Sequence, residues 1–312
     1  MQDKVGVVTH SKGSSYTVLT QDSPHQVVEC RLKGKLRLTE WNATNPIAVG
    51  DTVYFTIQDD GNGLIHNIAE RKNAIIRKAI GKHTQAHIIA SNIDQLIVLA
   101  TLAQPRTSLG FIDRMLVIAE AYKIPHSVVL WNKADLYDES MQEQVQEYVK
   151  MYQSIGYDSK VVSALEQKHL PTIVEIIQNK VSAIVGHSGT GKSSLLNLIE
   201  PTLNLKVGQV SQWNQKGRHT TTLATMYSLP KYNAYIIDTP GIKELDFFNI
   251  EKEEVSRYYV DFLPYLSGCK FSNCLHRNEP HCGVKQALAE GKIYSQRYQN
   301  YLGIIEMLEK QV

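Results

Sequence analysis

The sequence predicts a multidomain fold with an N-terminal β-barrel, a central α/β domain and a mostly helical C-terminal domain that binds a metal. Three observations support this prediction. Residues 1–70 form short β-rich runs, residues 71–250 alternate apolar strands with helices, and residues 251–312 are charged helices around a group of cysteines. The length of 312 residues also exceeds that of one average domain.

The N-terminal region contains five short β-rich runs, separated by Gly, Asn, Asp and Pro. They are "KVGVVTH", "SSYTVLT", "QVVECRL", "DTVYFTI" and "GLIHNIA". Short strands at this spacing are typical of a small barrel or sandwich. The run "RLKGKLR" places four positive charges within seven residues. It is either a solvated strand or loop, or a contact with nucleic acid.

The central region alternates apolar strands with amphipathic helices. "QLIVLAT" and "SVVLWN" are apolar runs, and a helix around "GFIDRMLVIAEAYK" lies between them. Further helices and strands continue to "VSAIVG". Strands that are apolar along their whole length indicate a parallel sheet with both faces covered by helices.

A phosphate-binding loop follows the strand "VSAIVG". The stretch "GHSGTGKSS" fits the pattern G-x-x-x-x-G-K-[ST] and continues into a helix. Its glycines let backbone N–H groups close around phosphate oxygens, and the helix N-terminus adds positive potential. Lys192 would bridge the β- and γ-phosphates, and the Ser193 hydroxyl would bind Mg²⁺. The predicted nucleotide-binding residues here are Gly186, His187, Ser188, Gly189, Thr190, Gly191, Lys192, Ser193 and Ser194.

The stretch "NKADL" predicts that the nucleotide is a guanine nucleotide. The Asp135 carboxylate can accept hydrogen bonds from the N1–H and the exocyclic amine of guanine, whereas adenine would leave it unpaired. We therefore expect Asn132, Lys133 and Asp135 to read the base. In "SAL", Ser163 and Ala164 end a later strand, where GTP-binding proteins place backbone donors to guanine O6. This match is partial, because the third residue there is more commonly Lys.

Two further motifs follow the phosphate loop. The strand "YIIDTPG" ends in Asp238, which would hold Mg²⁺ through a water, and in Gly241, whose N–H would reach the γ-phosphate. "GRHTTT", at residues 217–222, stands where a switch loop would supply a threonine to Mg²⁺, and we assign Thr221 to this role. The alternative for this run is a solvated loop or a strand edge.

The residue after "DTPG" bears on how water is activated. Ras-like GTPases use a glutamine there to orient the attacking water, and this chain has Ile242. An aliphatic side chain cannot hydrogen-bond water, so we expect the isolated protein to hydrolyse GTP slowly. His219, within "GRHTTT", is our candidate for the group that orients the water, and a solvated loop residue is the alternative.

The order of these motifs is reversed relative to Ras-like proteins. The base-reading "NKADL" precedes the phosphate loop, although each motif follows a strand as it should. Joining the original termini and opening the chain elsewhere would leave the three-dimensional site intact. The central domain is therefore predicted to be circularly permuted.

Three of the four cysteines fall within fourteen residues, which favours a metal site over a disulfide framework. Cys269, Cys274, His276 and Cys282 have the spacing C-x4-C-x-H-x5-C. Three thiolates and one imidazole predict a closed, structural zinc site with one Zn²⁺ per chain. Spare thiols are the alternative, and spacing does not exclude His281 as a ligand.

The composition is that of an ordinary globular protein, with 43% hydrophobic and 21% charged residues. A net charge of +2 gives no strong case for binding nucleic acid or membranes through bulk charge. No apolar run reaches the ~18 residues of a membrane span, and the start "MQDKVGVVTHSKG" does not resemble a signal peptide. We expect a cytoplasmic monomer that does not contact membranes.

Together, "NKADL", "GHSGTGKSS", "GRHTTT", "DTPGI" and the cysteine cluster make the chain resemble the RsgA family, also called YjeQ or YloQ. The resemblance covers essentially the whole length. It implies that the barrel is an OB-fold and that the central domain is a GTPase using Mg²⁺. It also implies that the 30S ribosomal subunit and its 16S rRNA are the partners. The family acts late in maturation of that subunit, which stimulates hydrolysis, and hydrolysis is coupled to release.

Two other functions remain open from the sequence. The first is an RNA-binding assembly factor whose guanine-nucleotide site is largely static. The second is a metabolic kinase with a phosphate loop, which "NKADL" disfavours because it selects against ATP.

Overall fold

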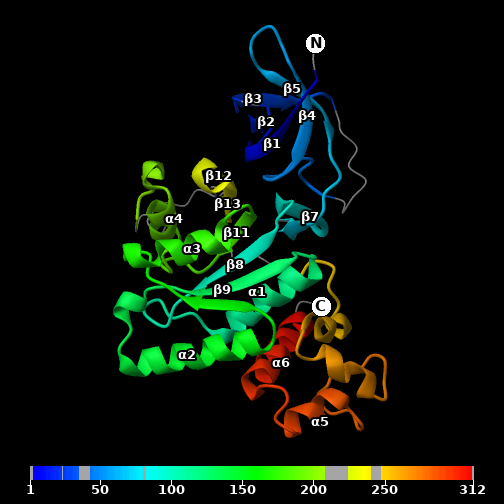
Figure 1. The fold of residues 1–312 in the computed structure, drawn as a ribbon. Coiled ribbons are helices and arrows are strands. Elements are labelled where there is room, and N and C mark those ends of the chain that lie inside the picture. The colour runs from blue at the N-terminus through cyan, green and yellow to red at the C-terminus, as the bar shows by residue number, and fades with distance from the viewer. Residues whose placement is uncertain are drawn as a thin grey trace.

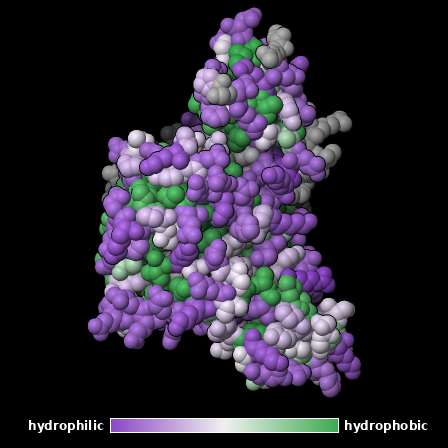
Figure 2. All heavy atoms as spheres, in the orientation of Figure 1, coloured by the Kyte–Doolittle hydropathy of each residue, from purple (hydrophilic) through white to green (hydrophobic). Residues whose placement is uncertain are grey.

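The computed structural model describes residues 3–22, 24–34, 43–79, 82–207, 224–239 and 247–310, with only the backbone described at residues 82–84. Figure 1 shows three regions along the chain: a β-rich N-terminal region, a central sheet covered by helices, and C-terminal helices beside α1 (Leu109–Ala121). None of the helices in the described ranges is long and apolar enough to cross a membrane. Figure 2 shows that hydrophilic side chains cover most of the visible face.

The N-terminal region is a closed five-stranded barrel, as predicted. Its strands are β1 (Asp3–Lys12), β2 (Ser15–Thr20), β3 (Val27–Leu32), β4 (Thr52–Ile57) and β5 (Gly63–Ile68). They close in the order β1-β2-β3-β5-β4-β1, with β3 and β5 parallel and the other pairs antiparallel. Alternate residues point inward, and Val8, Val18, Phe55 and Ile65 fill the interior.

The central region is the predicted α/β domain. Its strands are β8 (Gln95–Ala100), β9 (His126–Trp131), β10 (Asp158–Val161), β11 (Val181–Val185), β12 (Thr225–Leu229) and β13 (Ala234–Asp238). They lie in the order β10-β9-β8-β11-β13-β12, and only β12 runs antiparallel to its neighbour β13. The carboxyl ends of the five parallel strands therefore share one edge.

Helices cover both faces of this sheet. Besides α1, they are α2 (Glu139–Ser154), α3 (Leu170–Ile177) and α4 (Lys192–Ile199), with short 3-10 turns at Ala134–Leu136, Gln167–His169, Pro201–Leu203 and Pro230–Tyr232. Val98 packs in the core on the side of α1 and α2, whereas its neighbour Leu99 packs in the core on the side of α3 and α4. Burial on both faces explains why the central strands β8, β9 and β11 are mostly apolar along their length.

A hairpin that the sequence did not predict lies between the barrel and the central sheet. It consists of β6 (Ala74–Ala79) and β7 (Lys82–Ser91). The barrel also joins the sheet directly, because β1 pairs with β12 at His10 and Thr225. In the described part of the chain, barrel and central strands thus form one eleven-stranded sheet.

A buried ion pair fixes this junction. The Asp51 carboxylate accepts hydrogen bonds from Arg71 at 2.6 and 2.7 Å and from the Ser91 hydroxyl at 2.6 Å. Both charged side chains are almost fully buried. These contacts cross residue 70, where we divide the barrel from the central domain, so that boundary stays a prediction.

The C-terminal region is mostly helical, as predicted. It contains the 3-10 segments Lys252–Tyr258 and Leu263–Gly268, then α5 (Gly283–Ala289) and α6 (Ser295–Glu309). Arg297 of α6 reaches Asp113 of α1 and Asp261, each at 2.6 Å, and all three are buried. A buried charge left without its partner is strongly destabilising, so this ion triad ties α6 firmly to the central domain.

Candidate functional site

The phosphate loop lies between β11, which ends at Val185, and α4, which begins at Lys192. Gly191 has a φ of 101°, in the left-handed region, and a Cβ there would lie 2.3 Å from Asn132 Nδ2. Glycine is therefore required at this position for both conformation and space. The Lys192 ammonium folds over the loop and donates to the carbonyl oxygens of Gly186, at 2.6 Å, and His187, at 3.1 Å. The loop thus has the geometry of a phosphate cradle.

Asp238 stands beside this loop, because β13 pairs with β11 and aligns Asp238 with Ile184. Its Oδ1 is buried and has no hydrogen-bond partner among the described residues. Burial raises the pKa of Asp238, and Lys192 opposes that shift. Burial also lowers the pKa of Lys192, which Asp238 opposes. A buried carboxylate oxygen without a partner, next to the first turn of α4, fits a hydrated Mg²⁺ carried in with a nucleotide.

Asn132 brings the two separated motifs together at the carboxyl edge of the sheet. Its Nδ2 donates to the carbonyl of Thr190 in the phosphate loop at 2.8 Å, and its Oδ1 accepts from the Ala164 N–H at 2.9 Å. The side chain is almost fully buried. One amide thus joins segments that lie far apart in the sequence, and the reversed motif order still assembles a single site.

Asp135 faces the same edge. The Ser163 hydroxyl donates to Asp135 Oδ1 at 2.5 Å, which orients the carboxylate. The Ala164 N–H, which we expected to meet guanine O6, is bonded to Asn132 in this structure. Leu165, at the position where Lys is more common, is 75% exposed.

Lys133, in "NKADL", is bonded to the segment that follows β8. It has a left-handed backbone, with φ of 67°, and its ammonium donates to the Gln104 carbonyl at 2.6 Å. Burial lowers the pKa of Lys133, and Asp135 opposes the shift.

No motif marks the segment that follows β8, yet this segment borders the site. Pro105 lies against Gly189 of the phosphate loop, within 3.4 Å of where a Cβ would stand. The Phe111 ring packs on the His187 ring with centroids 4.1 Å apart. Its place in the chain could have predicted this role, because the segment follows the carboxyl end of a parallel strand, where such sheets bind ligands.

Several predicted residues lie outside the described residues. They are residues 35–37 of "RLKGKLR", the switch residues His219 and Thr221 and, after Asp238, the residues Gly241 and Ile242. Their roles therefore stay predictions.

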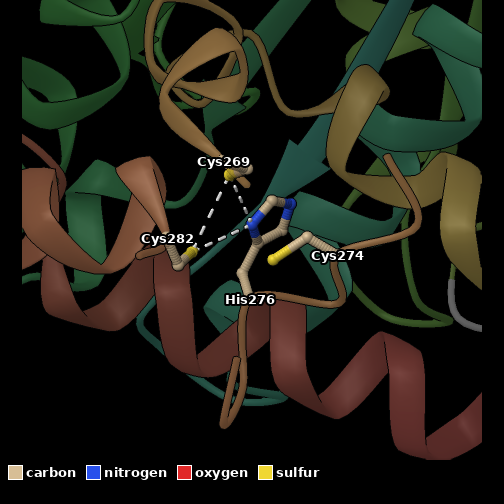
Figure 3. A group of neighbouring side chains, drawn as sticks. All are labelled: Cys269, Cys274, His276 and Cys282. Atoms are coloured by element: carbon tan, nitrogen blue, oxygen red, sulfur yellow. Dashed lines mark hydrogen bonds between the residues drawn. The ribbon is translucent and has the colours of Figure 1, made fainter. Parts of the chain in front are cut away.

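The cysteine cluster forms a second site, in the C-terminal region (Figure 3). Among the described residues, Cys269, Cys274, His276 and Cys282 bring their ligand atoms within 4.8 Å of one another. Cys269 Sγ lies 3.9 Å from Cys282 Sγ, and His276 Nδ1 lies 3.5 and 3.3 Å from these two sulfurs. A tetrahedron with Zn–S bonds of ~2.3 Å has edges of about 3.8 Å, so these separations fit a zinc ion.

The protonation chemistry of the cluster agrees with a metal site. Burial raises the pKa of Cys274 to about 12 and also raises that of Cys282, while it lowers the pKa of His276. Such thiols stay protonated unless a cation compensates the buried charge. His281, which spacing left open as a ligand, is not part of the cluster.

Helix α6 supports the loop that carries these ligands. The Tyr298 hydroxyl donates to the His276 carbonyl at 2.6 Å, and the Tyr301 hydroxyl donates to the Leu275 carbonyl at 3.0 Å. The cluster is therefore fixed to the helix that Arg297 anchors on the central domain.

Comparison with known families gives two matches. The family described as RsgA N-terminal domain matches residues 5–65, and the family described as RsgA GTPase matches residues 68–248. The second match alone spans more than half of the chain.

Relatives match over nearly their whole length. A protein of Flavobacterium psychrophilum named small ribosomal subunit biogenesis GTPase RsgA is 45% identical over 304 residues, covering 96% of this chain and 92% of its own. A protein of Bacteroides fragilis with the same name is 41% identical over 305 residues, covering 98% and 97%.

Two solved structures are also similar. YjeQ from Thermotoga maritima has a TM-score of 0.80 and 34% identity, covering 98% of this chain and 99% of its own. YloQ, described as a circularly permuted GTPase, has a TM-score of 0.76 and 30% identity, covering 100% and 96%.

Proposed function

This chain belongs to the RsgA GTPase family and is a GTP-hydrolysing enzyme, and on that premise we propose that it acts in biogenesis of the small ribosomal subunit. Relatives named for small ribosomal subunit biogenesis support the proposed role, and the Asn132 bridge is the observation that carries the nucleotide site it depends on. By bonding both Thr190 and Ala164, this side chain joins a guanine-reading motif to a phosphate loop. The alternative, an assembly factor with a static nucleotide site, needs no switch segments. This chain has two motifs in switch positions after the phosphate loop, "GRHTTT" and "DTPG".

Different residues bind the phosphates, the base and the Mg²⁺ ion in this proposal. Lys192 and the backbone of residues 186–191 hold the phosphates, and Asp135 pairs with the guanine base. Ser193, Asp238 and Thr221 would hold the Mg²⁺ that accompanies GTP, and that ion would neutralise charge on the phosphates. The Gly241 N–H would contact the γ-phosphate.

In this proposal, water is activated only when the enzyme is bound to the small subunit. Ile242 cannot orient water, so turnover of the isolated enzyme is slow. On the small subunit, His219 would orient the attacking water. Hydrolysis is then coupled to release from the subunit, because the switch segments no longer contact a γ-phosphate.

The partner in this proposal is the 30S subunit with its 16S rRNA, met in the cytoplasm by a monomer. Residues 71–93, which include the hairpin β6–β7, support RNA contact. Besides Arg71, which is buried against Asp51, they contain four basic residues, Lys72, Arg77, Lys78 and Lys82, and no Asp or Glu. A local excess of positive charge of this kind attracts a phosphate backbone even when the net charge is small.

Co-sedimentation with purified 30S subunits tests the proposal. We expect the protein to pellet with the subunits when a non-hydrolysable GTP analogue is present and to remain mostly in the supernatant with GDP. The matched control uses 50S subunits, which should retain little protein with either nucleotide. Equal, weak retention by 30S subunits with both nucleotides would contradict a nucleotide-dependent role on that subunit.

A further inference from the structure

A histidine outside every predicted motif holds the loop that contacts Asp135. His169 stands just before α3, where a residue would ordinarily cap its own helix, but its side chain makes no such cap. Its Nδ1 instead accepts a hydrogen bond from the Ser163 N–H, at 3.0 Å. Ser163 is fully buried, and its hydroxyl orients the Asp135 carboxylate. His169 therefore acts on the base-reading carboxylate through Ser163.

This contact requires one protonation state of the ring. An imidazole nitrogen that accepts from a backbone N–H must carry a lone pair, so the proton of the neutral ring is on Nε2. The same Nδ1 lies 3.4 Å from Glu166 Oε2. If the ring takes up a second proton, Nδ1 becomes a donor, repels the Ser163 N–H and has a carboxylate acceptor within reach. The geometry thus offers His169 two partners, one for each charge state.

We propose that His169 is a positioning residue for guanine recognition, which fixes Ser163, and through it Asp135, only while its ring is neutral. This inference rests on the proposed role of Asp135 as the base reader. It adds a pH-dependent step to that role, because imidazole side chains titrate between about pH 5 and 8. Acidification turns the ring toward Glu166, loosens residues 163–165 and weakens guanine-nucleotide binding.

The surroundings of His169 allow this change. The ring borders an open cavity of about 720 Å³, so solvent protons reach it. The charged groups that line this cavity with it are Asp135, Glu166 and Lys168 on its own side, and Glu143, Glu147 and Lys150 on α2. A protonated ring would therefore lie beside four carboxylates and two ammonium groups.

The test measures the affinity of the full-length protein for fluorescent GDP, with Mg²⁺ present, at about pH 7.5 and about pH 5.5. In His169→Asn, the amide oxygen stands near the position of Nδ1, accepts from Ser163 and cannot be protonated. We expect this variant to bind as the wild type does at the higher pH and to lose less affinity at the lower pH. His169→Ala should bind about three- to tenfold more weakly at the higher pH, the range of one net hydrogen bond.

His126→Asn is the matched control, because His126 is exposed at the opposite end of β9. It should reproduce the wild-type affinities at both pH values, whereas any loss that remains in His169→Asn measures titration of the nucleotide itself. The inference is overturned if His169→Asn loses as much affinity on acidification as the wild type, or if His169→Ala binds normally. A wild-type protein that does not prefer GDP to ADP would instead refute base reading by Asp135, which is a separate failure.

Discussion

Replacing Asp135 by asparagine should move the nucleotide preference from GTP to xanthosine triphosphate. The carboxylate accepts two hydrogen bonds from guanine, each strengthened by its charge and worth about 1.5–3 kcal/mol. Asparagine presents one donor and one acceptor, which suits the C2 carbonyl of xanthine and opposes the amine of guanine. We expect GTP affinity to fall about 100-fold or more, while xanthosine triphosphate gains affinity. Competition binding with both nucleotides measures the exchange.

Asp138→Asn is the matched control for this substitution. Asp138 lies three residues further on and caps α2 by accepting from the Met141 N–H at 2.8 Å. Asparagine caps helices about as well, so the control should keep the wild-type preference. Wild-type GTP affinity in Asp135→Asn would show that another group reads the base.

Removing zinc should loosen the C-terminal region. We expect purified protein to contain one zinc per chain and Cys274→Ser to lose most of it, with an earlier thermal unfolding transition. The effect should be large, because structural zinc sites contribute about 10–16 kcal/mol of apparent binding free energy in small zinc peptides. Zinc retention should also fall as the pH falls, since protons compete for thiols whose pKa burial raises. Elemental analysis and thermal unfolding measure these results.

Cys30→Ala is the matched control, because Cys30 is also buried but stands in the barrel, away from the cluster. Its substitution can lower the stability of the barrel, yet zinc content should stay at one per chain. Undisturbed protein without bound metal, or Cys274→Ser with full zinc content, would rule out the assignment of this cluster.

The sequence predicted those features that depend on local pattern. The strands β8, β9 and β11 were predicted because residues that face either core are mostly apolar. The phosphate loop was predicted because only glycines permit its backbone. The zinc ligands were predicted because they lie close together in the chain, as Cys269 and Cys282 show.

Contacts between distant segments could not be predicted in this way. Arg297 and Asp113 look like surface charges in the sequence, since residue type does not reveal that a partner from another helix buries both. The pairing of β1 with β12 depends on how two domains meet, and hydrophobic alternation specifies only which face of a strand is buried. The bond from Ser163 to His169 likewise joins a strand end to the start of a helix, and neither periodicity nor a motif marks it.

Multiple-turnover phosphate release, measured with and without 30S subunits, tests the central claim most directly. The claim is that this GTPase is slow alone and is activated by the small subunit. We predict slow release from the isolated protein, strong stimulation by 30S subunits, and loss of most of that stimulation in His219→Ala with GTP affinity nearly unchanged. If 30S subunits leave the rate of the wild-type protein at its slow basal value, the protein is not a subunit-activated GTPase.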